Sequence, residues 1–309
     1  MSKGKRRIRK VAVLGSGVMG SQIAAHCINA GLEVVLLDLK SDDPKRPNKT
    51  AEESIKNILK MKPAPFGLPE FADRIKLGNF EDDFDLLKDA DWICEVIIER
   101  MDIKKDMMSR IEKVRKSDTI VSSNTSGLPI TDIGEDCGKD FKEHFLGTHF
   151  FNPPRYMKLL EIIPTKHTSK EIACFMHGFC ERVLGKGVVL CKDTPNFIAN
   201  RVGIFSIGSM MPYFFNGDFR AEEIDLLTGT LTGYSKAATF RTGDMAGLDV
   251  TLHVANNIIP SIPDDEKKEV FDLPEQFKKM VESGKTGNKA GKGFYSKVRE
   301  NGKTEYKVI

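Results

Sequence analysis

Short apolar runs alternate with helical stretches along most of the chain. Apolar residues at helical spacing predict helices at residues 18–30, 50–61 and 103–114. Between the helices, short apolar runs have the length of strands that are buried on both faces. These runs lie at residues 11–14, 34–37, 74–77, 92–96, 120–122 and 145–151. Because strands and helices alternate, the pattern predicts an α/β fold with a doubly wound, mostly parallel sheet.

The pattern changes after the apolar run at residues 188–190. From Pro195 onward, apolar residues recur at helical spacing and no convincing strand follows. Residues 222–231 and 250–259 are helix candidates, and only a short, charged, strand-like piece ends the chain. We therefore expect two domains: a sheet domain over residues 1–191 and a smaller, all-α domain over residues 192–309.

Three glycines join the first expected strand to the first expected helix. Gly15, Gly17 and Gly20 follow one another there, with Val18 and Met19 before the last of them. In a Rossmann-like domain the first such glycine makes a tight turn, the second lets the backbone approach a pyrophosphate, and the third lets the helix pack close to the sheet. The helix N-terminus adds N–H groups and a partial positive charge. The alternative is a purely structural turn.

Asp38 ends the second expected strand, eighteen residues after Gly20. An acid at this position can bind both hydroxyls of a ribose and repels a 2′-phosphate, which favours NAD over NADP. Lys40, Lys45 and Arg46 lie nearby and leave NADP open as the alternative.

A histidine and a glutamate twelve residues apart are the candidate base and its partner. His149 lies at the end of a late strand, where open α/β sheets bind ligands, and Asn152 and Pro153 follow it in a turn. Glu161 lies on the next extended segment, where it could return beside the imidazole. A carboxylate behind a histidine fixes the tautomer and stabilises the imidazolium. The alternative is a histidine that belongs only to the core.

Two polar segments remain open to more than one interpretation. Small hydroxyl residues at 122–126 follow the fifth expected strand, and they suit either a helix cap or a substrate contact. Asn200 has a mid-helix position in the pattern, which is mildly unfavourable and suggests a use at the cleft. For Arg201 a structural ion pair is the simpler interpretation.

Composition and charge exclude several classes of protein. Lys and Arg number 47 and Asp and Glu 44, so the net charge of +3 gives no sign of nucleic-acid binding. The basic residues between Lys3 and Lys10 are expected to form a solvated tail. No segment has the roughly 20 apolar residues of a membrane span. The six cysteines form no C-x-x-C pair, which suggests reduced thiols in the cytoplasm and no metal site. Cys27 and Cys94 lie in apolar runs and are predicted to be buried.

Together these residues resemble the 3-hydroxyacyl-CoA dehydrogenase family over about residues 9–296. The details are closest to the fused fatty-acid β-oxidation proteins, in which the dehydrogenase precedes an enoyl-CoA hydratase-like region. The motifs that carry the resemblance are GSGVMG from Gly15, SSNTSG from Ser122, HFFNP from His149, KLLEIIP from Lys158, DTPNFIANR from Asp193, ATFRT from Ala238 and GNKAGKGFY from Gly287.

The resemblance implies NAD-dependent oxidation of (S)-3-hydroxyacyl-CoA to 3-oxoacyl-CoA in fatty-acid β-oxidation. In it, His149 is the general base, Glu161 is its partner, and Ser123 and Asn200 contact the substrate. Rival activities are reduction by a 3-hydroxybutyryl-CoA dehydrogenase and a catalytically idle relative of the fold. A 6-phosphogluconate-type NADP dehydrogenase would instead need a basic residue in place of Asp38 and a lysine base.

The resemblance also extends to the cofactor, the CoA moiety and the assembly. Glu99, Lys104 and Lys289 match family positions that reach NAD, and the CoA-contacting helix corresponds to residues 49–62, with Lys56 and Lys60 as candidates. Single-function members form homodimers through the helical domain, and a fused hydratase region is a further expected partner. Surplus apolar residues that suit such a dimer are Ile204, Phe205, Ile207, Met210, Met211 and Phe214.

Overall fold

The computed structural model describes residues 6–300 and 303–308 and divides the chain into two compact units. The units are Met1–Phe197 and Ile198–Ile309, and each is described by itself. The division falls six residues after the expected boundary at residue 191. Cys191 and Phe197 belong to the core of the first unit, and Asp193 accepts hydrogen bonds from the backbone of Ile130 and Thr131 in that unit. These contacts bind the connecting segment to the sheet unit.

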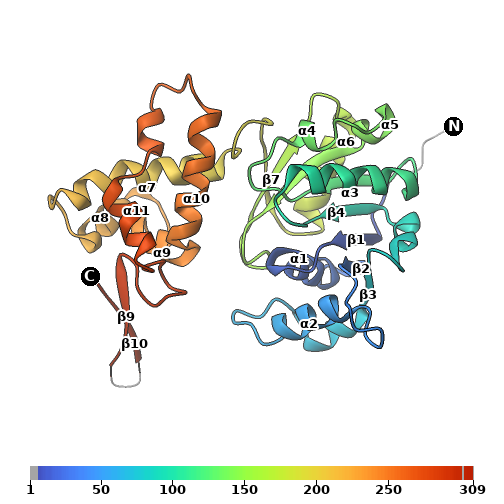
Figure 1. The fold of residues 1–309 in the computed structure, drawn as a ribbon, viewed down its shortest axis with the longest axis horizontal. Coiled ribbons are helices and arrows are strands. Elements are labelled where there is room, and N and C mark those ends of the chain that lie inside the picture. Colours follow the sequence, from blue (N-terminus) through green and yellow to red (C-terminus); the bar gives the residue numbers. More distant parts are fainter. Residues whose placement is uncertain (1–5, 301–302, 309) are drawn as a thin grey trace. The chain divides into compact units, whose positions relative to one another are not determined.

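The first unit is built on one eight-stranded sheet with the order β3-β2-β1-β4-β5-β6-β7-β8 (Figure 1). Neighbouring strands are parallel except β6 and β7, which are antiparallel. The mostly parallel, doubly wound sheet is therefore confirmed. The strands are β1 Lys10–Leu14, β2 Glu33–Asp38, β3 Ile75–Asn79, β4 Trp92–Glu95, β5 Ile120–Ser123, β6 Phe145–Phe150, β7 Leu159–Pro164 and β8 Gly187–Leu190.

Helices cover both faces of this sheet (Figure 1). On one face, apolar side chains of α1, α2 and α6 pack against alternate residues of the strands, such as Val11 and Val13. On the other face, α3, α4 and α5 cover Ala12 and Leu14. The alternation follows from the pleat, which points successive side chains to opposite faces. The helices are α1 Val18–Asn29, α2 Lys49–Ile58, α3 Met101–Val114, α4 Ile130–Ile133, α5 Lys139–Glu143 and α6 Lys170–Arg182.

The second unit is mainly helical and has its own core. Phe240, Phe277 and Phe294 are fully buried there, and Phe240 stacks on Phe294 with ring centroids 4.1 Å apart. The helices are α7 Ala199–Phe215, α8 Ala221–Thr228, α9 Phe240–Ala246, α10 Leu248–Ile258 and α11 Glu275–Glu282. The expectation of an all-α domain is wrong in one respect, because β9 Tyr295–Glu300 and β10 Lys303–Val308 pair as an antiparallel hairpin. This hairpin corresponds to the short, charged, strand-like piece that the sequence predicted at the end of the chain.

Cys27 and Cys94 are buried, as the sequence predicted. All six cysteines are free, and five of them are buried. Burial raises the pKa of the Cys94 thiol to about 12 and that of Cys27 well above its usual range, so neither forms a reactive thiolate. Within residues 6–300 and 303–308, no helix is long and apolar enough to cross a bilayer.

Candidate active site

The predicted site residues of the first unit gather where the parallel strands end. Gly15 follows β1, Asp38 ends β2, Ser123 ends β5, and His149 is the last residue but one of β6. Parallel strands place their carboxyl ends on the same edge, and open α/β sheets bind ligands there. The topology therefore brings the glycine turn, the acid and the histidine to one edge of the sheet.

The glycine turn is tight where it meets the sheet and open where α1 begins. Gly15 has a φ of +99°, and a Cβ on Gly20 would lie 1.8 Å from the Gly15 carbonyl oxygen. A Cβ on Gly17, in contrast, would meet no atom within 4 Å. The helix then begins at Val18, whose side chain is exposed, and continues through the partly buried Met19. This open N-terminus has the geometry that a pyrophosphate requires.

Asp38 is held in place by the glycine turn. Its carboxylate accepts hydrogen bonds from the backbone N–H of Ser16 and from the Ser16 hydroxyl at 2.6 Å. Two nearby cations that could favour NADP are engaged with other acids. Lys40 pairs with Asp82 at 2.8 Å, and Arg46 pairs with Glu52 at 2.7 Å.

His149 and Glu161 form a buried pair across β6 and β7. They are direct partners in the antiparallel register, and His149 Nδ1 lies 2.7 Å from Glu161 Oε2. The side chains are 5% and 1% exposed. The structure thus confirms that Glu161 lies beside the imidazole of His149, as predicted. The pairing also explains the spacing of twelve residues, since a turn carries the chain from β6 back along β7.

Further contacts fix this pair and the turn after it. The Cys191 thiol lies 3.5 Å from Glu161 Oε1, and the ring of Phe151 packs against His149. In the turn, the Asn152 side chain accepts a hydrogen bond from Gln22 at 3.0 Å. Lys186 Nζ donates to the Met157 carbonyl at 2.9 Å, and burial lowers the pKa of this lysine to about 8.

Ser123 lies in a buried polar network that the sequence did not reveal. Its hydroxyl donates to Glu95 Oε2 at 2.5 Å, and Glu95 Oε1 lies 2.6 Å from Lys104 Nζ. Ser123, Glu95 and Lys104 are all buried. Lys104 also lies 3.3 Å from Glu99, whose carboxylate accepts from the Thr125 hydroxyl and the Ser126 N–H. The only signal of Glu95 in the sequence is an acid at the end of an apolar strand.

The two interpretations of the hydroxyl segment can now be compared. The first backbone N–H groups of α4, those of Ile130 and Thr131, bond to Asp193. The Ser122 hydroxyl bonds instead to Trp92 and Thr148, and that of Ser123 bonds to Glu95. A helix cap therefore does not account for Ser122 or Ser123.

The predicted CoA-binding lysines lie on and after α2. Lys56 is in the last turn of this helix, Lys60 follows it, and both are exposed. The Ser54 hydroxyl of the same helix donates to the Ser16 carbonyl in the glycine turn. The structure thus places α2 beside the expected cofactor site.

Three predicted residues belong to the second unit. Asn200 is the second residue of α7, so the expectation of a mid-helix position is wrong and the cost of an asparagine within a helix does not apply. Arg201 forms the expected ion pair, with Asp265. Lys289 Nζ lies 2.5 Å from Asp249, and both side chains are about half exposed.

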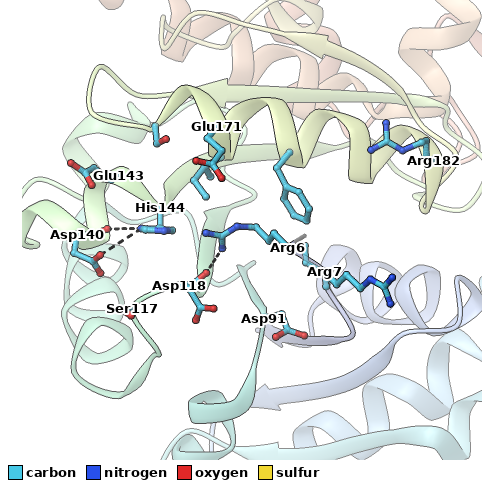
Figure 2. A pocket seen from close by; sticks show the side chains of 14 residues that line it. Arg6, Arg7, Asp91, Ser117, Asp118, Asp140, Glu143, His144, Glu171 and Arg182 are labelled. Atoms are coloured by element: carbon cyan, nitrogen blue, oxygen red, sulfur yellow. Dashed lines mark hydrogen bonds and ion pairs between the residues drawn. The ribbon is translucent and has the colours of Figure 1, made fainter. Parts of the chain in front are cut away.

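A polar cavity of about 1080 Å³ lies at the opposite edge of the sheet and contains none of the predicted site residues (Figure 2). Its lining includes Asp91 and Asp118, which precede β4 and β5. Arg6 donates to the Asp118 carbonyl there and lies over the Phe175 ring. Arg6 is therefore not part of a solvated tail, whereas Lys3 and Lys5 fall outside the described residues. Within the lining of this cavity, His144 Nδ1 lies 3.8 Å from an oxygen of Asp140.

Comparison with known protein families decides the identity of the two units. The model of the 3-hydroxyacyl-CoA dehydrogenase NAD binding domain matches residues 10–194, and that of the C-terminal domain matches residues 197–297. The chain belongs to the 3-hydroxyacyl-CoA dehydrogenase family. Membership places it among NAD-dependent dehydrogenases, and the resemblance inferred from the motifs is confirmed.

Individual relatives agree with this assignment. A probable 3-hydroxyacyl-CoA dehydrogenase of Bacillus subtilis is 48% identical over 98% of this chain, which spans only 40% of that protein. One of Deinococcus radiodurans is 45% identical over 95% of this chain and 84% of its own length. The crystal structure of (S)-3-hydroxybutyryl-CoA dehydrogenase from Ralstonia eutropha is 28% identical, with a TM-score of 0.74 over 93% of this chain and 98% of that one.

Proposed function

We propose that this chain oxidises (S)-3-hydroxyacyl-CoA to 3-oxoacyl-CoA with NAD. The observation that carries the proposal is the buried His149–Glu161 pair, at the same edge of the sheet as the glycine turn and Asp38. A base beside a dinucleotide site suits the removal of a proton and a hydride from one alcohol. Family membership supplies the substrate class.

In this proposal His149 moves the proton of the substrate. Its Nδ1 is engaged by Glu161, so Nε2 is the nitrogen that accepts the proton of the 3-hydroxyl. The Glu161 carboxylate then stabilises the imidazolium. Bound NAD supplies the hydride acceptor for C3, whose bond to oxygen becomes double. In the reverse direction His149 returns the proton as a general acid.

The remaining residues bind and orient the ligands. By the resemblance, Ser123 and Asn200 contact the oxygens of the substrate near C3 and the thioester. The turn at Gly15, Gly17 and Gly20 and the open start of α1 suit the NAD pyrophosphate. Glu99, Lys104 and Lys289 are the further NAD positions that the family suggests, and Lys56 and Lys60 are the candidates for the CoA phosphates.

Asp38 is expected to select NAD. Its carboxylate repels a 2′-phosphate, so the parent should use NAD with a kcat/KM at least about tenfold above that with NADP, a difference of about 1.4 kcal/mol. Asp38→Asn removes the charge and should lower the ratio of kcat/KM with NAD to kcat/KM with NADP. Asp42→Asn changes an exposed acid in the following loop and should leave this ratio unchanged. Steady-state rates with both cofactors measure this. Equal or better use of NADP by the parent would mean that Lys45 or another cation binds the 2′-phosphate.

The metabolic role is proposed as fatty-acid β-oxidation in the cytoplasm, where free thiols such as the six here persist. The Ralstonia relative is named for 3-hydroxybutyryl-CoA, which keeps reduction of short 3-oxoacyl-CoA as the second candidate. Loss of NADH absorbance with acetoacetyl-CoA tests the activity, and rates over a series of acyl lengths separate the two roles. No turnover with any length would instead favour a catalytically idle relative.

We propose a homodimer through the second unit, but fewer apolar residues support it than the sequence suggested. Ile204, Ile207 and Met211 are buried within that unit, so they are not the surplus that the sequence suggested. Met210 and Phe214 pack partly against the same core. The exposed apolar residues that support the proposal are Val202, Phe205, Leu226, Leu227 and Leu231.

Light scattering at micromolar concentration is expected to give twice the chain mass of 34.5 kDa. Large exposed apolar patches mark interaction surfaces in soluble proteins, and this expectation requires the exposed apolar residues of the second unit to form one. A mass of one chain at that concentration would refute the dimer, and cover by a further region of the polypeptide would then be the better explanation.

We further propose that the natural polypeptide continues into a hydratase region. The chain spans 40% of the Bacillus relative, and a Rickettsia prowazekii relative, of which it spans 42%, is named a putative fatty acid oxidation complex trifunctional enzyme. The 309 residues alone should oxidise 3-hydroxyacyl-CoA without hydrating crotonyl-CoA, because hydration needs a separate oxyanion hole. Loss of the crotonyl-CoA enoyl absorbance on incubation with this chain would count against the idea.

A further inference from the structure

Glu95 is a buried acid for which the proposed reaction has no use. It is the last residue of β4 and the direct register partner of Ser123 on β5. Its side chain is fully buried. A buried carboxylate is costly unless charged and polar partners satisfy it. Its partners therefore reveal what it does.

Three donors surround the carboxylate of Glu95. Oε1 accepts from the Ile97 N–H at 2.8 Å and from Lys104 Nζ at 2.6 Å. Oε2 accepts from the Ser123 hydroxyl at 2.5 Å. A carboxylate only accepts hydrogen bonds, so the proton between Ser123 and Glu95 comes from the serine.

Because the Ser123 hydroxyl donates its proton to Glu95, this hydrogen bond determines what Ser123 can offer to a ligand. Its oxygen already accepts from the Thr125 N–H at 3.3 Å, which leaves one lone pair and no proton. Ser123 is fully buried, so a ligand that reaches it meets hydrogen bonds that are shielded from water, where each one is strong. A keto oxygen presents only lone pairs to Ser123, whereas an O–H or N–H group fits.

We propose that Glu95 is a positioning residue that holds Ser123 as a hydrogen-bond acceptor, so that Ser123 binds a donor group of the ligand. The inference rests on the proposed function, in which Ser123 meets a ligand. Two sources offer such a donor: the carboxamide of the cofactor, and the 3-hydroxyl of the substrate in a complex whose single O–H proton points to Ser123 before it turns toward His149. Lys104 holds the opposite oxygen of Glu95, so this pair links α3 to the end of β4, and the Ser123 hydrogen bond extends the link to the end of β5.

Replacing Glu95 by glutamine should reverse the polarity of Ser123. In Glu95→Gln the amide oxygen must face Lys104 and the Ile97 N–H, because both are donors. The amide nitrogen then faces Ser123 and donates to its oxygen. The hydroxyl proton of Ser123 is released toward the ligand, which now favours an acceptor such as a keto oxygen.

The substrate arm of the test compares KM for (S)-3-hydroxybutyryl-CoA and for acetoacetyl-CoA. In Glu95→Gln the first should rise and the second should fall, and their ratio should change by about three- to tenfold, the range of one hydrogen bond. The cofactor arm compares by fluorescence the affinity for NADH and for its reduced 3-acetylpyridine analogue, which lacks the amide N–H. A loss of discrimination in this arm alone assigns the donor to the cofactor.

Matched variants separate this role from a merely structural one. Ser122→Ala removes the neighbouring buried hydroxyl, which bonds to Trp92 and Thr148, and should leave both ratios unchanged. In a Ser123→Ala background, Glu95→Gln should have no further effect on either ratio. Thermal unfolding of each variant shows whether it is folded.

Parallel changes of both KM values, unchanged ratios in both arms, or an effect that persists without Ser123 would overturn the proposal. Activity of the parent in the same assays shows separately whether the proposed function holds. If Glu95→Gln does not fold, Ser123→Ala alone decides: it should weaken the donor ligands three- to tenfold and spare the acceptor ligands, by about the worth of one hydrogen bond. Equal weakening of both would contradict the inference.

Discussion

Turnover of (S)-3-hydroxyacyl-CoA should fall by roughly 10²–10⁴ in His149→Gln, while NADH still binds. The glutamine has about the size of the imidazole but cannot accept the substrate proton. Glu161, which lies 2.7 Å from Nδ1, has no imidazolium to stabilise in this variant. The glycine turn and Asp38 are unchanged, so the cofactor affinity by fluorescence should remain near that of the parent. The loss should therefore appear mainly in kcat.

The chain contains a matched control for this substitution. His177 on α6 also faces a glutamate, with Nδ1 3.3 Å from Glu181, but these side chains are 32% and 45% exposed. His177→Gln should retain the rate of the parent. Turnover of His149→Gln within threefold of the parent would eliminate His149 as the base.

Lys104→Met should destabilise the first unit by about 3–5 kcal/mol, because the carboxylate of Glu95 would remain buried without its cation. The pair is nearly inaccessible to water, with side chains 1% and 0% exposed. Glu99 would lose a partner as well, although it is much more exposed. For a unit of this size the expected fall in Tm is roughly 6–20 °C, which differential scanning calorimetry measures directly.

Lys105→Met is the matched control, since this neighbour pairs with Glu135 and Asp136 on the surface. Exposed pairs contribute little, so its Tm should stay near that of the parent. A Tm for Lys104→Met equal to that of Lys105→Met would show that the buried pair is not a determinant of stability.

The sequence predicted the features that depend on residues close together along the chain. The glycines at 15, 17 and 20 predicted the turn and α1, because φ and helix packing constrain those positions directly. Asp38 followed from the length of one strand–helix–strand unit. The partnership of His149 with Glu161 could be predicted because a turn and an extended segment separate them, and antiparallel strands then bring them together.

Other features depend on contacts between distant segments. Glu95 and Ser123 lie 28 residues apart, and only the parallel register of β4 and β5 brings them together. Asp193, which accepts hydrogen bonds from the first N–H groups of α4, lies 62 residues from Thr131. The sequence predicted a short, charged, strand-like piece at the end of the chain but not its pairing, which joins β9 and β10 as an antiparallel hairpin. The position of Asn200 in the first turn of α7 depends on where the preceding segment leaves the first unit, which periodicity does not encode.

The most direct test is NADH formation, followed by its absorbance, when this chain meets NAD and (S)-3-hydroxybutyryl-CoA. The account predicts that NADH accumulates with the S enantiomer, does not with the R enantiomer, and is nearly abolished in folded His149→Gln. Absence of NADH from the S enantiomer with the folded parent chain, or equal rates with and without His149, would contradict it.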